Sequence, residues 1–223
     1  MAKRRIKAKI FKFVLVLILI GIIFCIYYFI IGDDISRVQI NNNYILSEKE
    51  ILELSKLDNY PSFLFTTKTE IAKNLKKSVL ISDVKVSKRL GKLIVLDITE
   101  NRILFKNSNN SKYVLSNYIE DVFDEEYDVP TLLNYVPDEI YKELIEKMSG
   151  INNNIIQKIS EIKYSPNEYD DDLFILYMND QNVVHVTLDK FTKLNKYNDI
   201  VVELEGDKGI LYLDSGDYFK IMN

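Results

Sequence analysis

The sequence predicts an α+β protein, in which one apolar helix precedes a β-α-α-β-β unit and then a mixed α/β unit. Nineteen consecutive residues, Phe13 to Ile31, carry no charge. Two amphipathic helix patterns follow within residues 48–77, and a hairpin pattern follows them over residues 80–100. Beyond residue 102, short alternating runs are mixed with two longer amphipathic segments. The chain therefore combines helices and sheets in every part beyond the apolar run.

The apolar run is long enough for a membrane span. At about 1.5 Å per residue it covers a hydrocarbon core of roughly 30 Å. A cleaved signal peptide is the alternative, but such peptides have a shorter apolar core and a cleavage site of small residues. Here the bulky residues Tyr27, Tyr28 and Phe29 occupy the exit. We therefore predict one uncleaved transmembrane helix over residues 13–32.

The charges on either side of this run set the predicted orientation. The formal net charge is −4, but residues 1–12 contain six Lys and Arg and no acid, which leaves −10 for the rest. By the positive-inside rule, residues 1–12 form a cytoplasmic basic tail and the bulk of the chain lies outside the membrane. A folded part this acidic argues against nucleic acid as a partner. Cys25 is the one cysteine and falls inside the predicted span, so no external disulfide is expected.

The first external unit covers residues 33–102. Ser47 and Glu50 have the spacing of a capping box, Thr67 can cap a second helix, and Gly91 supplies a hairpin turn. The predicted elements are a strand at 35–40, helices at 48–57 and 68–77, and strands at 80–88 and 93–100. The order β-α-α-β-β gives one sheet with two helices on one face.

The second external unit covers residues 103–223. Asp189 can cap its last helix, and Gly206 and Gly209 can end that helix. The predicted strands are 103–106, 113–116, 159–164, 173–178, 182–188 and 210–213. The predicted helices are 137–148 and 190–204, with a further helical turn or two in 151–158.

The residue types give no support to an enzyme. His185 is the one histidine, so a histidine-based triad or a multi-histidine zinc site cannot form. The S-x-x-K matches at 82–85 and 160–163 fall on predicted strands, whereas that chemistry needs its serine at a helix start. The acidic runs 120–128 and 168–172 lack the spacing of a calcium loop. We expect no catalytic residue, no metal site and no cofactor.

Two stretches of the first unit carry a resemblance to a known family. The segments ISRVQINNNYILSEKEILELSKL and VLISDVKVSKRLGKLIVLDITENR resemble the POTRA domain of the FtsQ/DivIB family of bacterial division proteins. Downstream, VPTLLNYVP and KLNKYNDIVVELEGDKGILYLDSGDYF resemble the start and the end of that family's β-domain, in its Gram-positive DivIB form. The sequence departs from the family at two places. Asn42-Asn43 replaces a Gly-containing turn, and Ser78-Val79-Leu80 lacks the Pro-Trp that commonly precedes the third segment.

The resemblance implies a non-enzymatic scaffold at the division septum. It implies a single-pass type II protein of the cell membrane that binds FtsB/DivIC and FtsL-type bitopic partners outside. Such a scaffold would help control the septal penicillin-binding transpeptidase. In the family, the last strand of the β-domain offers its edge to a partner. The matching positions here are Tyr212, Leu213, Asp214, Ser215, Gly216, Tyr218 and Phe219.

Alternative interpretations remain open at this point. Tyr218 and Phe219 could pack on their own sheet instead of meeting a partner. A POTRA-bearing component of protein export or envelope assembly would share the first unit, although it would usually carry several modules or a barrel. A membrane-anchored enzyme is disfavoured by the missing nucleophile and base.

Overall fold

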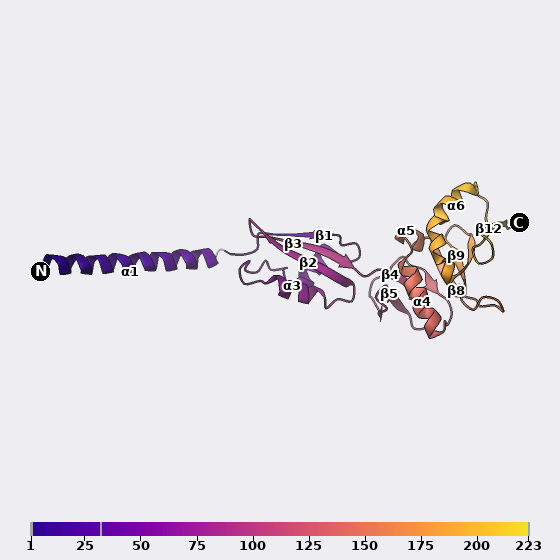
Figure 1. Cartoon of the computed structure of the whole chain (residues 1–223), viewed down its shortest axis with the longest axis horizontal. Coiled ribbons are helices and arrows are strands. Elements are labelled where there is room, and N and C mark those ends of the chain that lie inside the picture. The colour runs from indigo at the N-terminus through magenta and orange to yellow at the C-terminus, as the bar shows by residue number, and fades with distance from the viewer. Residues whose placement is uncertain (1, 32, 223) are drawn as a thin grey trace. The chain divides into compact units, whose positions relative to one another are not determined.

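The computed structural model describes residues 2–31 and 33–222, and within the first helix it describes the side chains of residues 11–27. The chain forms two compact units, residues 1–100 and 101–223 (Figure 1). Each unit mixes helices and strands. The predicted α+β class is therefore confirmed.

The first helix, α1, covers Ala2–Ile31. The large apolar side chains from Phe11 to Tyr27 are exposed. Searched over the described residues, the chain has no helix that satisfies both the length and the apolarity of a membrane span. The structure does not describe the side chains of residues 1–10, where most of the predicted basic tail lies. It also does not describe the side chains of residues 28–32, at the end of the predicted span.

The first unit continues with the predicted element order. Its elements are β1 (Arg37–Asn41), α2 (Glu48–Ser55), α3 (Lys68–Leu75), β2 (Ile81–Arg89) and β3 (Leu93–Glu100). The strand β3 lies at the centre of the sheet, parallel to β1 and antiparallel to β2. The apolar side chains of both helices and of β3 form the core, since Ile51, Ile71, Leu75, Ile94 and Leu96 are buried.

Both helices begin at the residues that the sequence indicates. The Ser47 hydroxyl accepts from the Glu50 N–H while the Glu50 carboxylate accepts from the Ser47 N–H, so the capping box is complete. The hydrogen bond from the Ser47 hydroxyl lowers the pKa of Glu50. The Thr67 hydroxyl accepts from the Glu70 N–H and begins α3.

A carboxylate at the end of β3 orders the turn between β1 and α2. Glu100 accepts hydrogen bonds from the backbone N–H groups of Tyr44, Ile45 and Leu46 at 2.8, 2.8 and 2.9 Å. Three consecutive N–H groups have no partner in a strand or helix at this point, and one ionised side chain satisfies them. The turn is thereby fixed to the far end of the central strand.

We predict that Glu100→Ala destabilises the first unit by about 2 kcal/mol, because three N–H groups lose a charged acceptor. Glu100→Gln keeps one acceptor oxygen and should cost less. The measurement is the free energy of unfolding of the purified full-length chain from urea titration. Equal stability of Glu100→Ala and the wild type would contradict this role.

The second unit contains one nine-stranded sheet with four short helices. The strands are β4 (Ile103–Asn107), β5 (Lys112–Leu115), β6 (Glu120–Asp121), β7 (Thr131–Leu132), β8 (Ile159–Tyr164), β9 (Leu173–Met178), β10 (Val183–Thr187), β11 (Gly209–Tyr212) and β12 (Tyr218–Ile221). Their order in the sheet is β12-β11-β10-β9-β8-β7-β4-β5-β6. The sequence prediction missed β6, β7 and β12.

The helices of this unit are α4 (Asp138–Ser149), α5 (Asn153–Ile156), the 3₁₀-helix η1 (Leu188–Lys196) and α6 (Tyr197–Glu203). Their apolar side chains and those of one sheet face share a single core. The predicted continuous α-helix over 190–204 is wrong. Leu188, Phe191, Leu194 and Tyr197 are all buried, and their spacing of three matches the 3.0 residues per turn of a 3₁₀-helix.

One further expectation needs correction. Asp189 does not cap the helix, because its carboxylate accepts from the Thr187 hydroxyl instead.

Arg102 lies in the compact unit 101–223. Its guanidinium donates to the carbonyl oxygens of Ser149 and Ile151, at 3.0 and 2.6 Å, at the end of α4. The Ser149 carbonyl is one of those that the end of α4 leaves unpaired, and Ile151 follows two residues later.

Candidate partner-binding edge

The nine-stranded sheet ends on one side at β12 and on the other at β6. The strand β12 pairs antiparallel with β11 on one side, from Tyr212–Tyr218 to Gly209–Ile221. No strand of the described residues pairs with the other side of β12. The edge strand β6 has two residues, so β12, with four, offers the longer free edge.

The structure relocates the edge that the sequence predicts. The prediction assigns it to the strand that ends at Leu213, but β11 lies between β10 and β12 and has no free side. Tyr212 therefore belongs to an interior strand, and Leu213 is buried in the core. The predicted residues Asp214, Ser215 and Gly216 form the turn between β11 and β12. Only two of the predicted residues, Tyr218 and Phe219, lie on the edge strand.

The register shows which backbone groups of β12 face outward. The Met222 N–H donates to the Lys208 carbonyl at 2.9 Å, which makes this a hydrogen-bonded pair. Inward- and outward-facing residues alternate along an antiparallel strand. The backbone N–H and C=O groups of Tyr218 and Lys220 therefore face β11. The backbone N–H and C=O groups of Phe219 and Ile221 face away from it. These outward groups are the hydrogen-bonding surface that another strand could use.

A glycine makes the pairing of β12 possible. A Cβ atom on Gly209 would lie 2.2 Å from the Lys220 carbonyl oxygen and 2.7 Å from the Phe219 ring. Atoms cannot approach that closely, so any larger residue would push β12 away. The sequence prediction used Gly209 only as a helix terminator, whereas the structure gives it this second role.

A buried polar network fixes the start of β11. Asn182, which is 2% exposed, accepts from the Gly209 N–H at 3.0 Å and donates to the Tyr197 hydroxyl at 3.1 Å. That hydroxyl donates to the Asp180 carboxylate. Burial, reinforced by Asp180, raises the pKa of Tyr197. Tyr197 therefore keeps its hydroxyl proton at physiological pH and remains a donor to Asp180.

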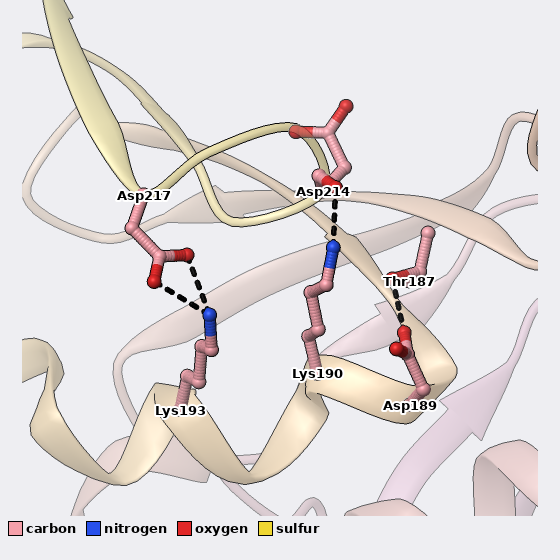
Figure 2. A network of polar contacts seen from close by, with 6 residues as sticks. All are labelled: Thr187, Asp189, Lys190, Lys193, Asp214 and Asp217. Carbon is pink, nitrogen blue, oxygen red and sulfur yellow. Dashed lines mark hydrogen bonds and ion pairs between the residues drawn. The ribbon is translucent and has the colours of Figure 1, made fainter.

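The turn between β11 and β12 is held from the other side by η1. Figure 2 shows two lysines of η1 pointing toward this turn. Lys193 contacts both carboxylate oxygens of Asp217 at 2.7 and 2.6 Å, and Lys190 donates to the Asp214 carbonyl at 2.5 Å. The ion pair is partly exposed, so its energetic contribution is small, about 0–1 kcal/mol. Its effect is to position the turn.

A row of rings crosses the sheet face opposite the core. The ring centroids of His185 and Tyr212 are 4.9 Å apart, and Tyr212 stacks on Tyr218 at 4.7 Å. Tyr218, on β12, is half exposed. Phe219 points to the opposite face and packs against the core. The alternative that both residues pack on their own sheet therefore holds for Phe219. Tyr218 instead extends the aromatic row to the edge of the sheet.

The chemistry available at this edge is hydrogen bonding and apolar contact. Among residues 2–31 and 33–222, no group of three His, Cys, Asp or Glu side chains is placed to hold a metal ion. Burial lowers the pKa of His185, and Asp214 opposes that shift.

The sequence signal for β12 was available, since Asp-Ser-Gly-Asp followed by Tyr-Phe-Lys-Ile has the pattern of a turn and a strand.

Comparison with known proteins finds a matching domain model and a set of similar proteins. The model of the POTRA domain, FtsQ-type, matches residues 34–101. Cell division protein DivIB of Bacillus subtilis is 26% identical over 195 residues, which cover 84% of this chain and 74% of that protein. The chain is similar over most of its length to cell division proteins of the DivIB type. The predicted resemblance is thereby confirmed.

Further relatives match over different shares of the chain. DivIB of Brevibacillus brevis is 28% identical, and the match covers 93% of this chain and 82% of the relative. DivIB of Bacillus anthracis is 25% identical, and the match covers 98% of this chain and 84% of the relative. A solved structure of the major extracytoplasmic domain of DivIB from Geobacillus stearothermophilus matches 48% of this chain and 96% of that chain, with 22% identity and a TM-score of 0.40.

We predict that Gly209→Ala detaches β12 from β11 and lowers the free energy of unfolding by about 1–3 kcal/mol, because the new methyl group collides with the Lys220 carbonyl. The backbone amides of Lys220 and Met222 should lose protection in hydrogen exchange. Gly150→Ala is the control, since Gly150 has an α-helical backbone. Unchanged protection in β12 of Gly209→Ala would refute the steric argument.

We predict that the stability of the second unit falls as the pH drops below about 6.5, the ordinary pKa of histidine. Because burial lowers the pKa of His185 in the folded chain, the unfolded chain binds more protons in this window. Stability contributed by neutral His185 is therefore full above the unfolded pKa and lost as the pH falls through the folded pKa. Urea titrations across this range should show a smaller loss for His185→Phe, which keeps a ring beside Tyr212.

Proposed function

We propose that this protein is a non-enzymatic bitopic scaffold of the bacterial divisome. In this proposal α1 crosses the cell membrane at the division septum, with residues 1–12 in the cytoplasm. Residues 33–102 act as the POTRA domain and residues 103–223 as the β-domain, both outside the membrane. The β-domain binds other division proteins and so organises septal peptidoglycan synthesis.

The surface of α1 supports the membrane anchor. Apolar side chains point outward all around the described part of the helix, from Phe11 to Tyr27, and more than half of the surface of many of them is exposed. Exposed apolar surface of this extent is unfavourable in water and favourable in lipid. A helix that is apolar on all sides is typical of a membrane span.

The free edge of β12 is the observation that carries the proposed binding role. An incoming strand could pair with the outward N–H and C=O groups of Phe219 and Ile221 and extend the sheet. Tyr218 would add a ring beside the new strand, in line with His185 and Tyr212. Aromatic side chains of this kind supply much of the contact energy at interfaces.

The edge of the first sheet at β2 contrasts with β12. The strand β2 carries Lys85 and Lys88, a register irregularity between Ile81 and Asp83, and an ion pair between Asp83 and Lys76. Charged side chains and bulges are devices that prevent edge-to-edge pairing. In β12, Lys220 is the one charged residue. Of these two edges, β12 is therefore the better candidate for strand addition.

The proposed partners are small bitopic division proteins of the FtsB/DivIC and FtsL types. Through them the scaffold would help control the septal penicillin-binding transpeptidase. The relatives named DivIB support a role in cell division. No catalytic residue, metal or cofactor takes part in this proposal.

We predict that Ile221→Pro abolishes partner capture by the β12 edge. Proline removes the outward N–H of Ile221 while leaving the bonds of Lys220 and Met222 to β11 in place. Ile221→Ala is the matched control, because it shortens the side chain and keeps the N–H. Both variants, as full-length detergent-solubilised protein, are used to capture proteins from membrane extracts, and mass spectrometry identifies them.

Retention of DivIC- or FtsL-type proteins by the wild type and Ile221→Ala, with loss in Ile221→Pro, is the expected result. Hydrogen exchange must show β12 still paired in Ile221→Pro, which separates lost binding from lost folding. Equal capture by all three proteins would refute the role of the edge. Capture of secreted client proteins in place of division proteins would refute the divisome assignment.

A further inference from the structure

The segment that follows α1 is bonded directly to the loop between α2 and α3. Asp33 is 6% exposed, and its carboxylate accepts from the Leu64 N–H at 2.5 Å and the Ser62 hydroxyl at 3.0 Å. The Asp33 carbonyl accepts from the Phe63 N–H at 2.6 Å. Asp33 lies two positions after Ile31, the last residue of α1. Residues reach at most about 3.6 Å each, so this loop lies within roughly a dozen ångströms of the end of α1.

The β2–β3 hairpin is bonded to the same segment. The Ser36 N–H donates to the Lys92 carbonyl at 3.0 Å. The Lys88 ammonium donates to the Phe63 carbonyl and lies 4.6 Å above the Phe63 ring. The tip of the hairpin, at Leu90, is therefore tied both to the chain leaving α1 and to the α2–α3 loop.

These two loops expose large apolar side chains at the end of the unit where the chain leaves α1. Leu64 is 58% exposed, Phe65 is 71% exposed and Leu90 is fully exposed. Single exposed apolar residues are common on proteins, but three on two bonded loops at one end of a sheet form a patch. Exposed cations flank them in the sequence at Lys68 and Arg89.

We propose that Leu64, Phe65 and Leu90 form a membrane-docking patch that enters the headgroup region of an anionic phospholipid bilayer. Lys68 and Arg89 contact the lipid phosphates beside it. The inference rests on the proposed membrane span of α1, which brings the patch to the bilayer surface. Apolar and aromatic side chains flanked by cations are what binds such an interface.

Docking would give the first unit a fixed orientation. A flexible connection after α1 would let the first unit turn freely. The hydrogen bonds of Asp33 hold the unit to the chain leaving α1, and the inserted patch would hold it to the bilayer at a second place. The central strand β3 then runs from Leu93 near the membrane to Glu100, about 23 Å further along at about 3.3 Å per residue. The patch thus sets which end of the first sheet faces the membrane.

The test places a fluorescent probe at the patch in the full-length protein. In a Cys25→Ser background, Phe65→Cys and Leu90→Cys are labelled with an environment-sensitive fluorophore. Tyr44→Cys is the matched control, because Tyr44 is an exposed aromatic residue in the turn bonded to Glu100, at the opposite end of β3. Each protein is reconstituted into vesicles of phosphatidylcholine with phosphatidylglycerol as a minor component. Circular dichroism checks that all three are folded.

We expect the probes at positions 65 and 90 to shift to shorter wavelength. Lipids spin-labelled in the headgroup should quench them several-fold more strongly than the probe at position 44. Equal quenching at all three positions, in protein that floats with the vesicles, would overturn the patch while leaving the anchor intact. Protein that fails to float would overturn the membrane span and the patch with it.

The lipid charge is tested in the same system. Vesicles of phosphatidylcholine alone, or the variant Lys68→Gln/Arg89→Gln, should weaken the quenching at position 65, because each cation near an anionic surface strengthens binding about fivefold. Quenching that is the same with and without anionic lipid would overturn the role of the two cations.

Discussion

The close approach of β12 to β11 at Gly209 is the constraint on which the candidate site depends. The missing Cβ admits the Lys220 carbonyl, and the Gly209 N–H is held by the buried amide of Asn182. With β12 in place, β11 becomes an interior strand and the sheet ends in a strand whose outer backbone groups are available. Had β12 not folded back, Tyr212 would have been the edge and Leu213 would have had less cover.

The structure uses carboxylate and amide side chains to hold the backbone where the chain changes direction. The Glu100 carboxylate accepts hydrogen bonds from three N–H groups of the β1–α2 turn. The Asp33 carboxylate accepts one from an N–H group of the α2–α3 loop. Asn182 does the same for the start of β11. Each of these groups joins positions far apart in the sequence, and a backbone group left without a partner at such a place would be costly.

The edge strands β2 and β12 differ in the features that hinder pairing with another strand. In the first unit, β2 is long but carries lysines, an irregular register and an ion pair. In the second unit, β12 is short and nearly uncharged, and η1 holds its turn through Lys190 and Lys193. An ordered edge strand without such features can pair with other chains and aggregate unless a partner covers it. This contrast favours β12 over β2 as a site for strand addition.

The sequence by itself indicated the resemblance to DivIB-type proteins, the α+β class and the order of elements in the first unit, because caps such as Ser47 with Glu50 and the alternation in β3 are local signals. It also singled out Tyr218 and Phe219. Tertiary structure decided which strand is the edge, since a four-residue strand after a turn gains its stability only by pairing with β11. It likewise decided that residues 188–196 form a 3₁₀-helix, because core packing overrides helix propensity there. Two-residue strands such as β7 have no periodicity to detect, so only the paired sheet reveals them.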